Sequence, residues 1–220
     1  MPLRERASPG AATGNRQGYG GAHVTTLANA PWMSEAVGAL AHELRSHHAP
    51  TADHSHRLAR LARGVADRLA LDPLDATEVE LVAVLHDVGK LTIDPGLLDW
   101  QGPLDDSQRA SLRRHTIAGE ELLAEISGLE HLATVVRATH EAWDGTGYPD
   151  GLAREGIPLT ARIVSAADSY DAMTSDRAYR AALPRREACR RLRRAAGVQF
   201  DPQVVDALLR VVRCRPLRLP

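Results

Sequence analysis

Apolar residues recur every three to four positions over most of this 220-residue chain, which is the period of an amphipathic helix. One such stripe runs through Leu58, Leu61, Val65 and Leu69. No segment alternates apolar and polar residues convincingly in the manner of a half-buried strand, so the pattern predicts an all-α fold. The expected helices span residues 34–48, 52–70, 76–88, 106–126, 130–141, 158–173, 185–195 and 202–213.

Local signals mark two helix starts and one long loop. Asp75 with Glu78 matches a capping box, in which the side chains at the helix start bond to each other's backbone N–H groups. Asp201 before Pro202 puts a cap ahead of a proline at the first helical position. Residues 142–157 are dense in Gly, Pro and Asp, which predicts an ordered loop.

The composition is that of one soluble domain preceded by a leader. Apolar residues make up 44% of the chain and charged residues 25%, an ordinary balance for a globular protein. Residues 1–31 carry little apolar surface, so we expect a flexible leader there and the domain over 32–220. The formal charge of −1 gives no global reason to expect DNA, RNA or a membrane as partner. The absence of a signal-like or membrane-spanning apolar run favours a cytoplasmic protein.

The two cysteines, Cys189 and Cys214, are far apart in the sequence and form no CxxC motif. Their spacing therefore indicates neither a disulfide framework nor a thiolate metal site. A reducing compartment fits this interpretation.

Several polar residues fall on the apolar faces of the expected helices. His54 lies four residues before Leu58 and should face inward, whereas His56 should face solvent. His140 and Asp168 likewise follow an apolar residue by four positions, and His115 lies within an apolar stripe. His86 and Asp87 end the apolar run LVAVLHD. The inward groups are His54, His86, Asp87, His115, His140 and Asp168.

A single inward histidine is more often bonded to a backbone carbonyl than to a metal. Six such groups on five helices are different, because unpaired they would cost more free energy than a domain's net stability. Gathered around divalent metal, they become its ligands. Imidazole and carboxylate without thiolate suit iron, manganese, zinc or nickel.

Asp87 and Lys90 suggest what the metals would do. An aspartate can bridge two cations, which is the arrangement for in-line displacement at phosphorus, so a phosphodiester is the natural substrate. Lys90 is the only lysine among 27 basic residues and follows Asp87 by about one helical turn. Its compact ammonium suits a phosphate oxygen.

Four segments carry a family resemblance: HDVGK at 86–90, HTIAG at 115–119, THEAWDGTGYP at 139–149 and ADSYDAMTSDRAYR at 167–180. In this order and spacing they closely resemble the HD-GYP domain, a branch of the HD superfamily of metal phosphohydrolases whose characterised members open cyclic di-GMP. The resemblance covers roughly residues 50–205 and implies an HD-type helical bundle with an ordered GYP loop.

The resemblance also implies roles for particular residues. One divalent metal would be held by His54, His86, Asp87 and Asp168, and a second would involve Asp87, His115 and His140. Lys90 would contact phosphate beside the metals. Residues expected to bind substrate or to shape its loop are Asp144, Gly145, Gly147, Tyr148, Pro149, Asp171, Arg177 and Arg180. For the two arginines, a surface ion pair is an equal alternative.

The chain departs from the family pattern at two positions. Thr139 stands where the family usually has the first of two adjacent histidines, and a hydroxyl is a poor ligand for a transition metal. Pro50 stands where members with a third metal carry a glutamate. We therefore expect two metals, the second more weakly held.

Three functions remain open at this stage. The first is a phosphodiesterase that hydrolyses cyclic di-GMP to the linear dinucleotide pGpG and then GMP. The second is a catalytically weak or inactive module that binds nucleotide or a signalling protein. The third is a phosphohydrolase acting on another nucleotide. The sequence does not indicate an oligomeric state.

Overall fold

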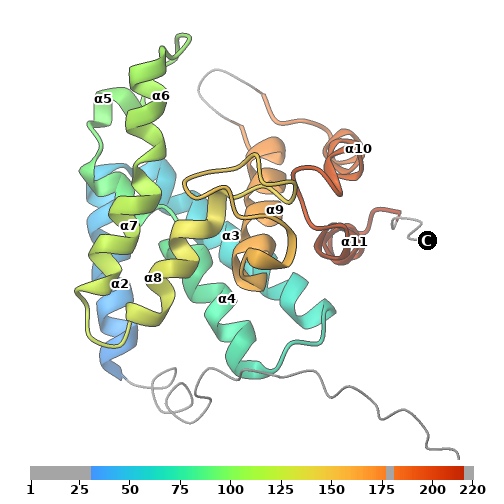
Figure 1. The fold of residues 1–220 in the computed structure, drawn as a ribbon, viewed down its shortest axis with the longest axis horizontal. Helices are drawn as coiled ribbons and strands as arrows, with labels where there is room; N and C mark the ends of the chain where they lie inside the picture. Colours follow the sequence, from blue (N-terminus) through green and yellow to red (C-terminus); the bar gives the residue numbers. More distant parts are fainter. Residues whose placement is uncertain (1–30, 177–180, 216–220) are drawn as a thin grey trace, which may run out of the picture.

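The computed structural model describes residues 31–176 and 181–215, so the expected leader falls almost wholly outside the described residues. Regular secondary structure in the described ranges is entirely helical, which confirms the all-α prediction (Figure 1). The elements are α2 (Pro31–His47), α3 (Ala49–Arg68), α4 (Pro73–Leu85), η1 (Val88–Thr92), α5 (Pro95–Leu98), α6 (Asp106–Arg113), α7 (His115–Ala124), α8 (Glu130–Arg137), η2 (Ala138–His140), η3 (Arg154–Gly156), α9 (Leu159–Thr174), α10 (Arg185–Ala195) and α11 (Pro202–Val211).

The start of α4 differs from the sequence prediction. Asp72 is the capping residue, and its Oδ1 accepts the backbone N–H groups of Leu74 and Asp75 at 2.9 and 3.0 Å. Pro73 follows at the first helical position, where its missing N–H costs nothing. The predicted capping box at Asp75 and Glu78 is wrong, because Asp75 already lies within the first turn.

The start of α11 agrees with the prediction, since the Asp201 side chain accepts the Gln203 N–H at 2.7 Å and Pro202 begins the helix. The single helix expected over 106–126 is instead two, α6 and α7, which meet at Arg114. None of the α6 residues is buried, whereas α7 buries one face. Sequence periodicity continues across the junction and therefore does not reveal the break.

The helix expected over 130–141 also ends early. After α8 the chain tightens into the 3₁₀ turn η2, which carries His140. The predicted ordered loop over 142–157 is confirmed, with one bridge between Asp144 and Ala153 and the short turn η3. This loop lies over the ends of α8 and α9 (Figure 1).

Helix α3 occupies the centre of the bundle and packs against α2, α4, α9 and α11. The core is aliphatic, and Leu58, Val82, Val164 and Leu208 have no exposed surface. Each fully buried side chain of this kind stabilises the fold by about 1.5–3 kcal/mol. Within the described ranges, no helix is both long and apolar enough to cross a bilayer.

The turn η1 approaches α7 so closely that their backbones touch. A Cβ atom on Gly89 would lie 1.9 Å from the His115 carbonyl oxygen and 2.5 Å from the Gly119 nitrogen. A side chain at Gly89 is therefore sterically impossible without moving one element. This contact brings the end of α4 against the start of α7.

The cysteine spacing indicated no disulfide framework, and this interpretation is wrong. Cys189 on α10 and Cys214 just after α11 form a disulfide. A sequence separation of 25 hides the pairing, but α10 and α11 pack side by side and bring the two sulfurs together (Figure 1). The inference of a reducing compartment loses this support.

Candidate metal centre

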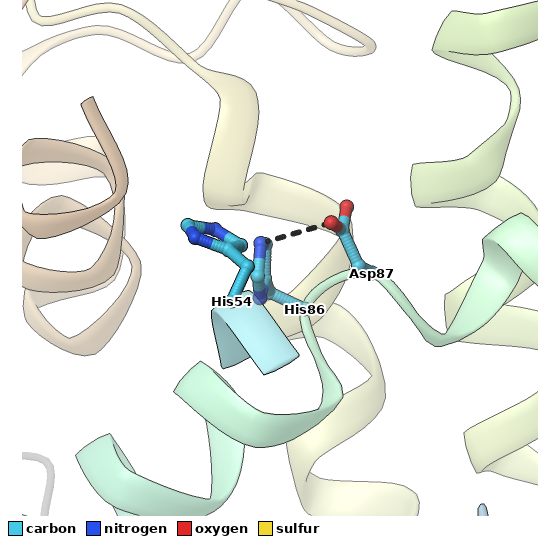
Figure 2. Close-up of side chains that lie close together, drawn as sticks. All are labelled: His54, His86 and Asp87. Atoms are coloured by element: carbon cyan, nitrogen blue, oxygen red, sulfur yellow. Dashed lines mark ion pairs between the residues drawn. The ribbon is translucent and has the colours of Figure 1, made fainter. Parts of the chain in front are cut away.

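The HD pair lies where α4 ends. Leu85 is the last residue of α4, and the next two, His86 and Asp87, are only 2% and 3% exposed. His86 Nδ1 lies 2.9 Å from the Ala83 carbonyl oxygen. Because a carbonyl can only accept, Nδ1 donates this hydrogen bond and Nε2 is left to face the centre. His86 Nε2 lies 3.4 Å from Asp87 Oδ2 (Figure 2).

Two more histidines approach Asp87 from the other side. His115 repeats the arrangement of His86, with Nδ1 2.6 Å from the Leu112 carbonyl oxygen and Nε2 3.5 Å from Asp87 Oδ1. The His140 ring lies edge-on to it, with 4.8 Å between the ring centroids. Burial lowers the pKa of His115, and burial together with His115 lowers the pKa of His140 to about 3. Both rings are therefore neutral.

Asp87 lies between these histidines and stays ionised. Burial alone would raise its pKa, but His86 and Lys90 hold the pKa well below its usual range. Lys90 Nζ donates to Asp87 Oδ2 at 2.7 Å. The carboxylate thus faces the Lys90 ammonium and the Nε2 atoms of His86 and His115.

The side chains form two groups of potential ligands that share Asp87. One is His54, His86 and Asp87, and the other is Asp87, His115 and His140. Within each group the potential ligand atoms all lie within 4.8 Å of one another. Figure 2 shows the first group, with His54 from the start of α3 facing the end of α4.

His54 is held by two carboxylates from α9. Its Nε2 lies 2.8 Å from Asp168 Oδ1, and its Nδ1 lies 2.6 Å from Asp171 Oδ2. Burial lowers its pKa, but these hydrogen bonds outweigh burial and raise the pKa to about 9. Burial would raise the pKa of Asp168, yet the bond to His54 brings it to about 2. Asp168 belongs to neither three-residue group and adjoins the centre through His54.

The donor set fits a divalent metal. His115 Nε2 and His140 Nε2 are buried and have no hydrogen-bond partner. An unsatisfied buried polar atom costs about 1–3 kcal/mol, so a bare arrangement of this kind is unfavourable. Neutral imidazole nitrogens beside a carboxylate are the ligands that iron, manganese, zinc and nickel prefer.

A cavity of about 670 Å³ opens over the first group. This volume is within the range of about 300–1,000 Å³ that is typical of small-ligand sites. His54, His86, Asp87, Lys90 and His140 form part of its wall, and residues of the α2–α3 junction, α5 and α9 form much of the remainder. Pro50, at the position of the family's extra glutamate, is on this wall and offers no ligand atom.

The GYP loop reaches the centre through Tyr148. Its ring stacks on His140, with centroids 5.2 Å apart and planes inclined by 3°. The Arg113 guanidinium lies 4.9 Å from the centre of the Tyr148 ring. Burial raises the pKa of Tyr148 to about 12, so its hydroxyl stays protonated. Tyr148 therefore supports His140 from the loop side.

The other loop residues that were predicted to bind substrate or shape the loop have contacts or backbone angles that stabilise the loop's conformation. Asp144 is exposed and accepts the backbone N–H and hydroxyl of Thr146 at 3.0 and 2.6 Å. Gly145 has a positive φ of 84°, which favours glycine. A Cβ on Gly147 would lie 2.2 Å from the Ala142 nitrogen, so the loop folds back on itself there. Pro149 lines a second groove beside α6.

Thr139 and Glu141, the residues on either side of His140, make hydrogen bonds to the backbone. Thr139 is 2% exposed, and its hydroxyl donates to the Val136 carbonyl oxygen at 2.8 Å. Glu141 is buried and accepts the backbone N–H groups of Asp150 and Gly151 at 2.7 and 3.1 Å. Thr139 therefore serves the backbone, and Glu141 fastens the loop beside His140.

The structure thus brings His54, His86, Asp87, His115 and His140 together, with Lys90 and Asp168 adjoining them. Arg177 and Arg180 lie outside the described residues, and their roles stay predictions. Sequence reasoning missed Arg57, which binds Asp171, and Arg113. Arg57 follows His54 by three residues, and this spacing could have indicated that the two side chains share one face of the helix.

Comparisons with known proteins identify the family and the fold. The sequence model of the HD domain family matches residues 38–204. The chain is 37% identical to the cyclic di-GMP phosphodiesterase response regulator RpfG of Xanthomonas campestris, over 80% of this chain and 47% of the relative. It is 39% identical to cyclic di-GMP phosphodiesterase PA4108 of Pseudomonas aeruginosa, over 74% and 40%. It is 35% identical to 3'3'-cGAMP-specific phosphodiesterase 3 of Vibrio cholerae, over 76% and 36%.

The chain spans less than half the length of each of these three relatives. Two solved structures share the fold. The cyclic GMP-AMP specific phosphodiesterase V-cGAP3 of V. cholerae matches with a TM-score of 0.61 and 19% identity, over 82% of this chain and 48% of that one. The HDG"Y"P protein Bd1817 of Bdellovibrio bacteriovorus matches with a TM-score of 0.61 and 19% identity, over 86% and 64%.

Proposed function

We propose, from the premise that this chain belongs to the HD domain family, that it is a metal-dependent phosphodiesterase acting on cyclic di-GMP. The observation that carries the proposal is the buried Asp87 carboxylate, which is shared by two groups of potential ligands beneath a cavity of about 670 Å³. The products would be linear pGpG and, after a second hydrolysis, GMP.

Two divalent ions, iron or manganese among the candidates, would occupy the centre. His54, His86, Asp87 and Asp168 would hold one, and Asp87, His115 and His140 the other. When bound, such a pair generates hydroxide from water at neutral pH and neutralises phosphate charge. Hydrolysis breaks one P–O3′ bond and joins the water oxygen to phosphorus, and the leaving 3′ oxygen takes a proton.

The protein's own residues would orient and neutralise the substrate. Lys90 hydrogen-bonds Asp87 and also lines the cavity, so its remaining N–H groups can meet a phosphate oxygen. Tyr148 would keep His140 in place through their stacked rings. Arg177 and Arg180 would contact phosphate or guanine, and Asp144, Gly145, Gly147 and Pro149 would shape the loop.

The relatives support the substrate class. Those named as cyclic di-GMP phosphodiesterases reach 39% identity, and one named for 3'3'-cGAMP reaches 35%. Both compounds are cyclic dinucleotides with two phosphodiester bonds. Since a hydrophobic or polar contact to a base can discriminate between purines, cyclic di-GMP and 3'3'-cGAMP should be compared directly.

A direct assay tests the proposal. The purified chain would be loaded anaerobically with Fe²⁺, Mn²⁺ or Ni²⁺ and mixed separately with cyclic di-GMP and 3'3'-cGAMP, and products would be separated by chromatography. We expect linear pGpG from cyclic di-GMP with at least one metal. Turnover of neither dinucleotide with any metal would overturn the proposal.

Thr139 favours a second candidate, a module that binds nucleotide or a signalling protein without efficient turnover. Its hydroxyl is committed to a backbone carbonyl, so the second group has one imidazole fewer than the family pattern. One metal per chain and tight cyclic di-GMP binding without product would support this candidate. Thr139→His should then raise turnover sharply. Hydrolysis of a different phosphorylated nucleotide in the same assay would support the third candidate.

A further inference from the structure

Asp171 is fully engaged by donors from the protein itself. Its Oδ2 lies 2.6 Å from His54 Nδ1. Arg57, one turn after His54 on α3, donates from Nε to Oδ1 at 3.3 Å and from Nη2 to Oδ2 at 3.2 Å. Ser175 adds a hydroxyl at 3.4 Å from Oδ2. Asp171 is buried, at 9% exposure, and therefore depends on these partners.

Asp168, one turn earlier on α9, faces the same imidazole in a different way. Its hydrogen-bond partner among the described residues is His54 Nε2, 2.8 Å from Oδ1. Two carboxylates thus flank one ring, but only Asp171 is clamped by an arginine. His54 Nδ1 is therefore held by the arginine-bound Asp171, whereas Nε2 faces Asp168, which no arginine holds.

We propose that Asp171, clamped by Arg57, is a positioning residue that orients the His54 ring and directs its Nε2 lone pair toward the metal. This role rests on the metal centre of the proposed function. It differs from the sequence-based expectation, in which Asp171 binds substrate. The relay runs from Arg57 through Asp171 to His54, across α3 and α9.

The chemistry of imidazole explains why such a relay is useful. A neutral imidazole carries its proton on one nitrogen, and a carboxylate at Nδ1 selects the form that leaves Nε2 free. The same carboxylate fixes the ring plane and strengthens the ligand. Arg57 in turn favours the ionised form of Asp171 and limits its rotation. Loss of such an outer partner typically weakens metal binding by about 10–100-fold.

The test measures Mn²⁺ affinity without nucleotide, by competition with a chelator. We expect Asp171→Ala to weaken one of the two bound ions by about 10–100-fold. Asp171→Asn keeps a neutral acceptor for Nδ1–H and should show a smaller loss. Arg57→Gln should follow in the same direction, since it removes the clamp but leaves the acceptor. The control is Asp53→Asn, which removes an exposed carboxylate next to His54 that pairs with Arg45, and it should leave affinity unchanged.

The outcomes separate this role from its alternatives. If Asp171 contacts substrate instead, Asp171→Ala would keep Mn²⁺ affinity and raise only KM, which would overturn the proposal. Should Asp171→Ala fail to fold, Asp171→Asn decides, and unchanged affinity in it counts against the relay. A chain that loses Mn²⁺ affinity in these variants, yet never hydrolyses cyclic di-GMP, would keep the relay and overturn the proposed function.

Discussion

The two halves of the candidate metal centre share Asp87 but differ in charge. In the first half, His54 is hydrogen-bonded to two carboxylates on α9, and its pKa is raised to about 9. In the second half, His115 and His140 are neutral, and their Nε2 atoms have no partner. One half is an ion-paired network, and the other holds two buried imidazole nitrogens that lack a hydrogen-bond partner.

This difference teaches how each half would acquire a metal. An ion entering the first half must displace a hydrogen bond between His54 and Asp168, but it gains a carboxylate beyond Asp87. An ion entering the second half meets no hydrogen bond at His115 Nε2 or His140 Nε2, yet Asp87 is the only carboxylate in that three-residue group. The second half should therefore depend more on Asp87 and on the placement of its two rings.

The largest effect is expected for Asp87→Asn, which keeps the side-chain volume but removes the shared charge. Both halves should lose metal, and hydrolysis should fall by more than the roughly 100-fold that loss of an outer partner can cause. Elemental analysis and product chromatography measure the two effects. Full metal content with retained turnover would show that the centre is misplaced.

Gly89→Ala should separate the two halves. The added Cβ would collide with the His115 carbonyl oxygen, so η1 and α7 must move apart. We expect the free energy of unfolding to fall by about 3 kcal/mol or more, with loss of metal from the His115 half. Urea denaturation and metal content are the measurements.

Gly38→Ala is the matched control for this variant. Gly38 lies in α2 with no atom within 4 Å of an added Cβ. The substitution should be neutral or stabilise by up to about 1 kcal/mol, since alanine favours the helix. Equal effects at Gly38 and Gly89 would contradict the steric explanation.

Tyr148 should matter for the second half alone. Tyr148→Ala removes the ring stacked on His140, and an aromatic pair contributes about 0.5–1.5 kcal/mol. We expect Mn²⁺ affinity of that half to fall by up to about tenfold, while Tyr148→Phe keeps the stack and the affinity. Chelator competition resolves the two ions. A similar loss in the Phe variant would mean that the hydroxyl, not the stack, is responsible.

The smallest effect concerns the anchor of the loop that carries Tyr148. Arg137 on α8 donates to both Asp150 oxygens at 2.7 Å and to Glu120 at 2.7 Å. Because these side chains are partly exposed, Arg137→Ala should lower the free energy of unfolding by only about 1 kcal/mol. Thermal melting measures it, and no change in Tm would show that the Arg137 ion pairs do not stabilise the loop.

The sequence predicted the fold class well because helix periodicity is a local property. Counting four residues back from Leu58 was enough to place His54 at the centre. The features that were predicted wrongly are contacts between distant segments and the points where helices begin or end. The true cap of α4 is Asp72, one residue before a proline, and a competing acidic pattern at Asp75 obscured it.

The candidate site shows the same division. Which residues face inward follows from spacing, and the resemblance assigned them to two ions. Which side chains bond to one another does not follow, because α3 and α9 are more than 100 residues apart along the chain where His54 meets Asp171. The Cys189–Cys214 bond is a second example, since only the packing of α10 on α11 reveals it.

The contact of Gly89 with the His115 carbonyl group has one more consequence. His86 and His115 belong to different halves, and the elements that carry them meet main chain to main chain. The backbone contact between η1 and α7 therefore fixes the distance between the halves. Substitutions of nearby side chains are therefore expected to change the free energy of unfolding without changing that distance.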